Sequence, residues 1–523
     1  MAQEEYSETG TSNGEKMNQS EINSHFMDPP VSVFRQAAPQ CIAVGAKNLL
    51  LMTFGTTLGF STILLPVLQE GKDISVTKDD LTWLSSLNLF LVPIGCVFSG
   101  PISQTLGRRK TMMLANFPFI LTWIMYHYAS NSTILFVSLV ITGLTGGLLE
   151  APVMTYVAEI TQPHLRGMLS ATSTVAVILG IFAQMLTGSL VSWRTTALIN
   201  IAYPLMCFSA LCFVPESPYW LASKGRMAES EKALCWLRGW VSTAHVKQEF
   251  QQMCDSMKIS QVTSSEKTKS NPMEYYKKRN FYVPFMLVAI SFFISAFGGS
   301  ITLQTFAVII FKGLDAPINK YTATVFLGLA ELVATIMCAV LIHFTGKRKL
   351  TFFSIVGTFV CFFVSAVYGY LLNSNGIDAS NYAWLPTTLM IGAAFFSHLG
   401  IRLLPWILAG EVFTSQVRST ATGIAGSLHY VFCFIANKTF IYMMEEMRLP
   451  GTFIFYASIN LAGLIILYFI LPETEGRTLL EIEEHFSGIQ NLKHRPRKEK
   501  LPSKEKWAVA NPAPINDDIE SKF

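Results

Sequence analysis

Long apolar stretches alternate with short polar segments along most of the chain. Each of the twelve stretches supplies the roughly 20 apolar residues that a helix needs to cross the hydrocarbon core of a bilayer. They predict membrane-spanning helices at 43–68, 82–104, 111–130, 133–158, 168–191, 195–214, 283–311, 319–344, 350–372, 384–410, 417–443 and 452–471. The composition agrees, since 51% of the residues are hydrophobic and 14% are charged, against roughly a quarter charged in a soluble chain. We therefore expect an all-α membrane protein.

The longest polar interruption, at 215–280, divides the twelve stretches into two sets of six. Its first part has the apolar periodicity of a helix, with Leu221, Leu234 and Leu237 on one stripe, whereas 256–272 is rich in Ser, Thr and Lys and indicates a linker. The predicted organisation is a disordered N-terminal tail (1–40), a six-helix bundle (41–214), a helical insert with its linker (215–280), a second six-helix bundle (281–472) and a C-terminal segment and tail (473–523).

Lys and Arg gather in the insert, in the C-terminal tail and in the loops that follow even-numbered stretches. The positive-inside rule places these segments and both termini in the cytoplasm of a multi-pass cell-membrane protein. A net charge of +4 does not indicate a nucleic-acid partner, because the basic clusters alternate with the spans. The chain has no Gly-rich phosphate loop, metal-ligand cluster or nucleophile arrangement. We expect no enzyme activity, no cofactor and no metal.

One charged cassette occurs once in each set of six stretches. Its first copy consists of Gly107-Arg108-Arg109-Lys110, Glu159 with Arg166, and Pro215-Glu216-Ser217; its second consists of Gly346-Lys347-Arg348-Lys349, Glu411 with Arg418, and Pro472-Glu473-Thr474. The copies follow the second, fourth and sixth stretches and the eighth, tenth and twelfth. Such duplication indicates a repeated six-helix membrane unit, from which many solute carriers are built.

The charges of the cassette are candidates for a cytoplasmic gate. The candidate residues are Arg108, Glu159, Arg166, Glu216, Arg348, Glu411, Arg418 and Glu473. Glu159 with Arg166, and Glu411 with Arg418, are expected at facing helix ends. Exposed ion pairs contribute only about 0–1 kcal/mol each, which suits a gate that must open. The alternative is that these charges only anchor helix ends and fix the topology.

The cassettes resemble the sugar porter branch of the major facilitator superfamily over about 40–485. The most specific pieces are Pro215-Glu216-Ser217-Pro218, Pro472-Glu473-Thr474-Glu475-Gly476-Arg477-Thr478-Leu479 and Glu159 with Arg166-Gly167. Lys224-Gly225-Arg226 and Lys438-Thr439-Phe440 look most like the facilitated trehalose transporters. The resemblance implies the major facilitator fold, a small-molecule solute of the sugar type, and a monomer in the lipid bilayer.

The expected pore departs from the pattern of that family. Its sugar-binding amides fall at Ser295, Ala296 and Ile301 in the seventh stretch, while its Trp is kept as Trp406. The candidate substrate-binding residues are Thr174, Glu331, His398, Arg402, Trp406 and His429. An ionisable residue inside a membrane is costly unless it faces a wet cavity or a partner, so it is a functional candidate. The alternative is a buried Glu331–Arg402 pair with two histidines in structural roles.

Ser61 stands where proton-coupled relatives carry a carboxylate, which favours uncoupled transport unless Glu331 or Glu150 takes over the proton. The leading hypothesis is a plasma-membrane facilitative sugar transporter of the trehalose or hexose type that works by alternating access. One alternative keeps the fold but carries a charged or zwitterionic organic solute, bound by Glu331 and Arg402. The other is a sensor that binds a nutrient without transporting it.

Overall fold

A computed structural model describes residues 32–71, 73–267, 279–314, 316–373, 384–414, 418–477 and 479–488, and the regular structure in these ranges is helical. The N-terminal half contains α2 (Val33–Gln69), α3 (Lys78–Leu84), α4 (Leu87–Leu106), α5 (Arg108–His127), α6 (Ser132–Leu148), α7 (Glu150–Ile160), α8 (Pro163–Leu190), α9 (Trp193–Asn200) and α10 (Ala202–Phe213). The C-terminal half contains α15 (Arg279–Phe297), α16 (Ser300–Thr305), α17 (Ala307–Gly313), α18 (Lys320–Thr345), α19 (Lys347–Asn373), α21 (Trp384–Leu399), α22 (Leu404–Glu411) and α23 (Arg418–Ile470).

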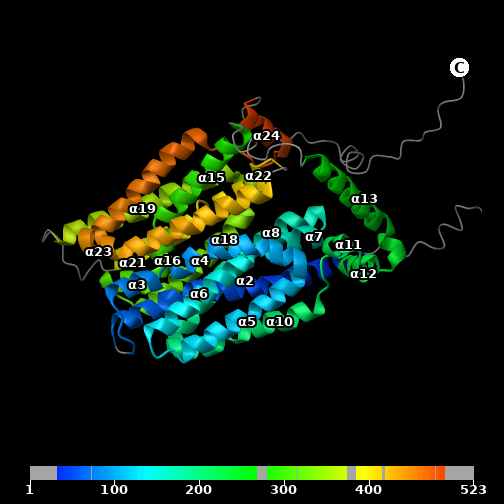
Figure 1. Ribbon diagram of the computed structural model, residues 1–523. Helices are drawn as coiled ribbons and strands as arrows, with labels where there is room; N and C mark the ends of the chain where they lie inside the picture. Colours follow the sequence, from blue (N-terminus) through cyan, green and yellow to red (C-terminus); the bar gives the residue numbers. More distant parts are fainter. Residues whose placement is uncertain are drawn as a thin grey trace, which may run out of the picture.

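The two halves lie side by side as two groups of long helices (Figure 1). Helix α8 packs against α18 and α4 packs against α23, which joins the halves along two seams. The insert forms α11 (Pro218–Ser223), α12 (Met227–Leu237) and α13 (Thr243–Lys267), and α24 (Leu479–Ser487) follows the second half. Helices α11–α13 and α24 lie at one end of the molecule, which we call the insert end (Figure 1).

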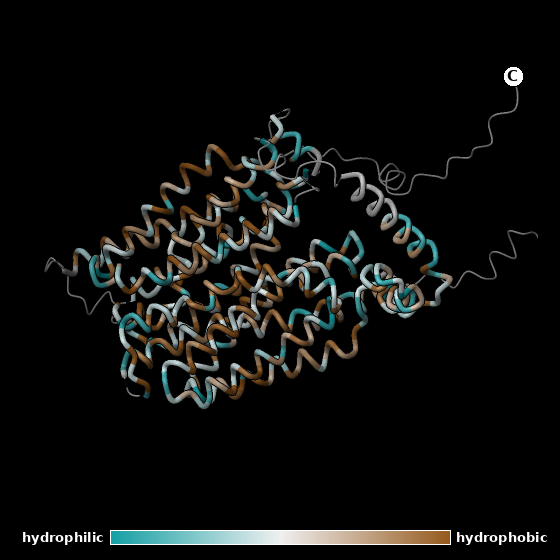
Figure 2. Tube along the Cα trace, viewed as in Figure 1, coloured by the Kyte–Doolittle hydropathy of each residue, from teal (hydrophilic) through white to brown (hydrophobic). Residues whose placement is uncertain are grey.

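The helices make twelve crossings, as the apolar stretches predict. Ten segments of the described chain are long and apolar enough to cross a membrane. One of them, within α23, contains two crossings, because Arg448 departs from helical geometry with φ 55° and ψ 179°. The remaining crossing is α5, which has 20 residues and packs against α6 and α10. Hydrophobic residues dominate the helices, and hydrophilic residues gather at both ends and in the insert (Figure 2).

Two predicted boundaries are wrong, and one helix was not predicted. The predicted tail 1–40 ends too late, because α2 already begins at Val33 and Ser32 caps it by accepting a hydrogen bond from the Arg35 N–H. Pro39 within α2 hides this start from the apolar pattern. The predicted linker 256–272 is helical up to Lys267. Helix α24 was not predicted, although Ile482 and Phe486 bury an apolar stripe against α15. Residues 1–31 and 489–523 lie outside the described ranges.

Glycines allow two helices of the N-terminal half to touch backbone to backbone. A Cβ atom added at Gly55 of α2 would lie 2.1 Å from the Val177 carbonyl oxygen of α8. One added at Gly180 of α8 would lie 2.2 Å from the Met52 carbonyl oxygen. Small residues bring helices together in this way because lipid supplies little hydrophobic drive for association.

Gly55→Ala should therefore lower the stability of the protein by about 1–3 kcal/mol, since the close-packed backbone must move to admit a methyl group. Gly45→Ala is the matched control, because Gly45 lies on the same helix and an added Cβ would meet nothing within 4 Å. Thermal unfolding in detergent measures the difference, and equal midpoints for the two variants would contradict the packing argument.

Candidate functional site

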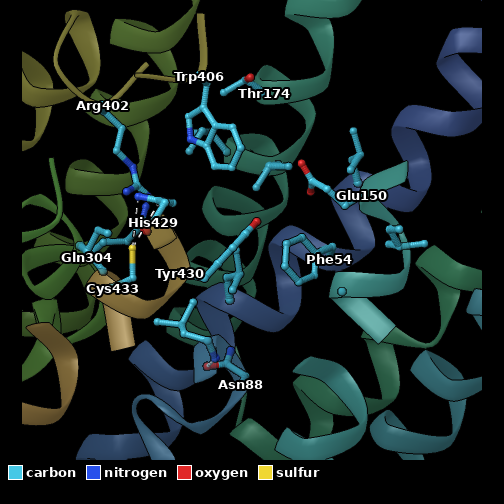
Figure 3. A pocket seen from close by; sticks show the side chains of 18 of the residues that line it. Phe54, Asn88, Glu150, Thr174, Gln304, Arg402, Trp406, His429, Tyr430 and Cys433 are labelled. Carbon is cyan, nitrogen blue, oxygen red and sulfur yellow. Dashed lines mark hydrogen bonds between the residues drawn. The ribbon is translucent and has the colours of Figure 1, made fainter. Parts of the chain in front are cut away.

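A cavity lies between the two halves. Its wall takes residues from α2, α4, α7 and α8 on one side and from α16, α22 and α23 on the other. Most of its polar groups are neutral hydroxyls and amides: Ser61, Ser85, Asn88, Ser173, Thr174, Gln304, Thr305 and Asn437. Charged or aromatic groups complete the wall, with Arg402 and Glu150 on opposite sides and Tyr430 and Trp406 between them (Figure 3).

Breaks in two helices place the charged groups of the wall. The fourth crossing breaks at Leu149, between α6 and α7, and Glu150 is the first residue after the break. Ser99 of α4 bridges this break, since its hydroxyl donates to the Leu148 carbonyl (2.9 Å) and accepts from the Ala151 N–H (2.8 Å). The unpaired peptide groups are thus satisfied by a neighbouring helix, as they must be inside a membrane.

The tenth crossing breaks in the same manner between α21 and α22, and Arg402 lies within the break. Pro405 in the first turn of α22 has no N–H to continue a helix from α21. Ser354 of α19 bridges this break, since it donates to the Phe396 carbonyl (2.6 Å) and accepts from the Ile401 N–H (3.0 Å).

A third break, at Gly298 and Gly299, brings an amide to the cavity. Gly299 has φ +92°, a left-handed conformation that favours glycine, and an added Cβ would meet Tyr456 at 2.7 Å. The short helix α16 starts after it and presents Gln304 to the cavity. Gln304 Nε2 donates to Glu331 Oε2 across 2.6 Å.

Trp406 and His429 belong to one aromatic cluster at the wall. The Trp406 ring meets Phe292 edge-on with centroids 5.0 Å apart, and meets His429 edge-on at 5.3 Å. His429 Nε2 lies 3.4 Å from Cys433 Sγ. These contacts fix the Trp406 ring, so that it offers a rigid apolar surface to a bound solute.

Four of the six predicted substrate residues line the cavity, namely Thr174, Arg402, Trp406 and His429. Glu331 and His398 do not. Glu331 is fully buried behind Gln304, and His398 is buried with Nδ1 3.0 Å from the Ala394 carbonyl oxygen. The alternative of a direct Glu331–Arg402 ion pair does not hold in the described chain, where Glu331 instead accepts a hydrogen bond from Gln304.

Sequence reasoning missed several residues of the wall. One of them is Asn437, whose Nδ2 donates to Thr305 Oγ1 and to the Ser85 carbonyl at the cavity. Another is Gln304, which lies three residues after Ile301, the position aligned with the family's helix-7 amide. An amide this close to the aligned position is the signal by which the sequence could have indicated it. Glu150 is an acid within a predicted span, but the orientation of its side chain depends on the helix break at Leu149. No sequence motif indicates that break.

The first copy of the cassette forms a compact cluster at the insert end. Arg108 binds the Glu159 carboxylate through two nitrogens, at 2.9 and 3.1 Å, and the Ser217 hydroxyl also donates to Glu159. Glu216 accepts from the Arg109 N–H at 2.9 Å. A carboxylate at this helix N-terminus compensates the free N–H groups and the helix dipole. Gly107, with φ +101°, leaves room for it, since an added Cβ would lie 2.5 Å from Glu216 Oε2.

The second copy repeats this arrangement with a lysine. Lys347 Nζ binds both oxygens of Glu411, at 2.6 and 2.7 Å, and Thr474 Oγ1 donates to Glu411 at 2.9 Å. Glu473 accepts from the Lys347 and Arg348 N–H groups at 3.1 and 3.2 Å. The side chain of Lys347, directly after the glycine, reaches the Glu411 carboxylate, whereas the predicted gate residue Arg348 meets Glu473 through its backbone N–H.

Acid–base contacts continue around this second cluster. Burial tends to raise the pKa of Glu475, but the hydrogen bond from His343 and the charge of Lys347 outweigh it and lower that pKa. Arg348 Nη2 instead donates to the Tyr468 carbonyl at 2.7 Å.

Arg166 and Arg418 do not pair with Glu159 and Glu411, contrary to prediction. Arg166 Nη2 lies 3.4 Å from the Thr161 carbonyl oxygen, and Arg418 Nε lies 3.1 Å from that of Phe413. Each arginine reaches back to the loop before its own helix. The nearer cations, Arg108 and Lys347, occupy the carboxylates instead.

Trp406→Leu should reduce transport at least tenfold while leaving the fold intact, because it removes the rigid ring from the cavity wall but keeps an apolar side chain against Phe292. The measurement is solute uptake at equal amounts of protein in the membrane. Trp384→Leu is the control, since Trp384 is exposed at the start of α21. Equal uptake by both variants would reject a role for Trp406 in the cavity.

Gly346→Ala should unfold at a lower temperature than Gly225→Ala. Both glycines have positive φ, so both variants are strained, but an added Cβ at Gly346 would also lie 2.6 Å from Glu473 Oε2. Around Gly225 it would meet nothing within 4 Å. The extra loss is about 1–3 kcal/mol, the cost of displacing a buried acceptor from its donors. Identical unfolding midpoints in detergent would show that the carboxylate contributes nothing there.

Comparisons with known proteins agree with this geometry. The facilitated trehalose transporter Tret1 of Bombyx mori is 28% identical over 463 residues, covering 87% of this chain and 89% of its own, and that of Apis mellifera ligustica is 26% identical over 87% and 91%. The xylose transporter XylE of E. coli, in a partially occluded inward-open conformation, superposes with a TM-score of 0.69 at 17% identity over 84% of this chain and all of its own. The predicted major facilitator fold is thereby confirmed. The model of the family described as "Sugar (and other) transporter" matches residues 40–486, and the chain belongs to this family of membrane transporters.

Proposed function

We propose that this protein is a facilitative sugar transporter of the cell membrane that works by alternating access between its two halves. The observation that carries the proposal is the cavity between the halves, whose wall combines eight neutral hydroxyl or amide side chains with the Trp406 ring. Sugars offer hydroxyl groups that both donate and accept, and an apolar ring face that stacks on aromatic side chains. Membership of the sugar transporter family supports the same conclusion.

The cargo we propose is trehalose or a hexose, and the curated relatives named as facilitated trehalose transporters support this choice. Transport is uncoupled in this proposal. Ser61, which stands where proton-coupled relatives carry a carboxylate, is a neutral part of the wall.

The ends of the molecule support alternating access, because they are held differently. Away from the insert end, contacts tie one half to the other: Lys438 Nζ donates to Thr82 Oγ1 at 2.6 Å and lies 4.1 Å from the Trp83 ring centroid. Tyr442 donates to Asp79 in the same region. We call this set of contacts, together with the ion pairs Lys78–Glu445, Lys320–Glu70 and Lys312–Glu70, the outer latch.

At the insert end, the ion pairs between described residues each lie within one half or within the insert. The two clusters therefore hold each half together as a rigid body and leave the halves free to separate there. We propose that the insert end and both termini face the cytoplasm, as the positive-inside rule indicates. The structure then corresponds to an inward-facing state, and the clusters form the cytoplasmic gate. The monomer contains the complete cavity, so we propose that the monomer is the transporting unit.

Uptake of labelled trehalose and glucose into proteoliposomes tests the proposal. We expect saturable uptake of at least one sugar that equilibrates across the membrane, with no accumulation driven by an imposed proton gradient. Accumulation driven by protons would reject the uncoupled mechanism. Uptake of a zwitterion such as glycine betaine, without either sugar, would establish the charged-solute alternative, and binding of sugar without any uptake would establish the sensor.

Lys438→Ala should shift the population from the inward-facing toward the outward-facing state. It removes a hydrogen bond and a cation–π contact of the outer latch, together about 1–2 kcal/mol, which is enough to change a balanced two-state ratio several-fold. Reaction rates of single cysteines placed near each end of the cavity measure the ratio. Lys247→Ala, on an exposed position of α13, is the control. Unchanged rates in the Lys438 variant would rule out the latch.

A further inference from the structure

The two halves carry opposite charges at one equivalent position. Glu150 lies nine residues before Glu159, and Arg402 lies nine residues before Glu411. Each residue sits at the break of its crossing, one between α6 and α7 and the other between α21 and α22. Because the halves of this fold are related by an axis along the membrane normal, equivalent positions lie at the same depth on opposite walls. Figure 3 shows the two side chains on opposite sides of the cavity.

Both charges are available to a solute. Among the residues that line the cavity, Glu150 and Arg402 are the two with a carboxylate, ammonium or guanidinium group. Neither forms an ion pair with a described residue. The Arg402 guanidinium lies beside Cys433, and its Nη1 is buried without a hydrogen-bond partner. Because Arg402 also lines the cavity, a solute there can supply the partner that this nitrogen lacks.

Each half also holds a buried ionisable side chain one layer behind the wall. Lys47 is fully buried in the N-terminal half, and its Nζ donates to the wall residue Ser173 at 2.6 Å. Glu331 is fully buried in the C-terminal half and accepts from the wall residue Gln304 at 2.6 Å.

We propose that Glu150 and Arg402 are the two charged poles of the cargo site, and that they make it specific for uncharged polyhydroxyl solutes over sugar acids and amino sugars. Glu150 accepts hydrogen bonds from hydroxyl groups at one side of the cargo, and Arg402 donates to hydroxyl oxygens at the other. This inference rests on the proposed function, because it specifies which sugars the same cavity takes.

The physical reason is the exclusion of water when the cavity closes. Charges in a dry cavity interact far more strongly than in water, so each must be matched. The two poles match each other when the cargo carries no net charge. A sugar acid would bind at Arg402 but would be repelled by Glu150, and an amino sugar would bind at Glu150 but would be repelled by Arg402. Either one leaves a single unmatched charge inside the membrane.

Removing one pole should therefore make the site favour a solute whose charge is opposite to that of the remaining pole. The measurement is inhibition of labelled neutral-sugar uptake in proteoliposomes by three unlabelled compounds: the same sugar, its 6-carboxylate derivative and its 6-amino derivative. We expect the wild type to bind both charged derivatives at least tenfold more weakly than the sugar. Glu150→Gln should improve the relative affinity for the carboxylate about tenfold, and Arg402→Gln should do so for the amine.

Matched variants separate charge from shape. Arg402→Lys keeps the charge and should retain the wild-type preference. The double variant Glu150→Gln with Arg402→Gln should show neither the improved affinity for the carboxylate nor that for the amine, because its cavity wall again carries no unmatched charge. Glu446→Gln removes an exposed carboxylate outside the cavity and should change nothing.

The outcomes distinguish this inference from the proposed function. Suppose that the wild type carries a neutral sugar, but that both single variants keep its charge preference or change it in the same direction. This result would overturn the two-pole assignment and leave the proposed function standing. Wild-type protein that carries no sugar would overturn the proposed function. If a single variant does not fold, the inference is tested on the wild type by measuring how far each of the three compounds raises its unfolding temperature. Stronger stabilisation by the neutral sugar supports the inference, and equal stabilisation by neutral and charged forms overturns it.

Discussion

No water reaches the hydrocarbon core of a bilayer, so every peptide N–H and C=O there must find a partner within the protein. This constraint decides where the crossings can break. Two breaks border the cavity between α6 and α7 and between α21 and α22, and at each a serine from a neighbouring helix serves one carbonyl and one N–H. Ser99 and Ser354 thus permit irregular backbone at the depth of the cavity. The positions of Glu150 and Arg402 depend on these breaks.

The duplicated architecture shows which parts of the repeat are fixed by geometry. A glycine with positive φ followed by a helix whose first N–H groups meet a glutamate occurs in both halves, at Gly107 with Glu216 and at Gly346 with Glu473. Only glycine fits this turn, and only an acceptor suits the helix N-terminus. The cation beside it is less constrained, since an arginine serves in one half and a lysine in the other.

The fold followed from the sequence because long apolar stretches have one stable arrangement in lipid, and because the cassette repeats at matching helix ends. The candidate site followed only in part. Trp406, Arg402, Thr174 and His429 line the cavity, as predicted from their alignment with the pore positions of the resembled family. An alignment does not determine which way a side chain points, and Glu331 lies behind the wall.

Local backbone geometry explains the other misassignments. The backbone turn at the positive-φ glycine Gly346 directs the side chain of Lys347 toward Glu411 and that of the next residue, Arg348, away from it. The spacing of residues in the sequence does not show which of these two neighbours faces the carboxylate. Helix breaks likewise redirect side chains without a motif, which is why Glu150 and Gln304 became visible as wall residues only in three dimensions.

The outer latch differs from the cavity in its exposure to solvent. The side chains of Lys78 and Glu445 are 44% and 49% exposed, and those of Lys320 and Glu70 are 25% and 33% exposed. Dissolved ions screen such pairs over roughly 8 Å at physiological ionic strength, whereas buried charges are screened much less. In the proposed transport cycle, the salt content of the fluid that bathes this face therefore acts as a thermodynamic variable. It changes the lifetime of the state in which the outer latch is closed, and it leaves the selectivity of the buried cavity unchanged.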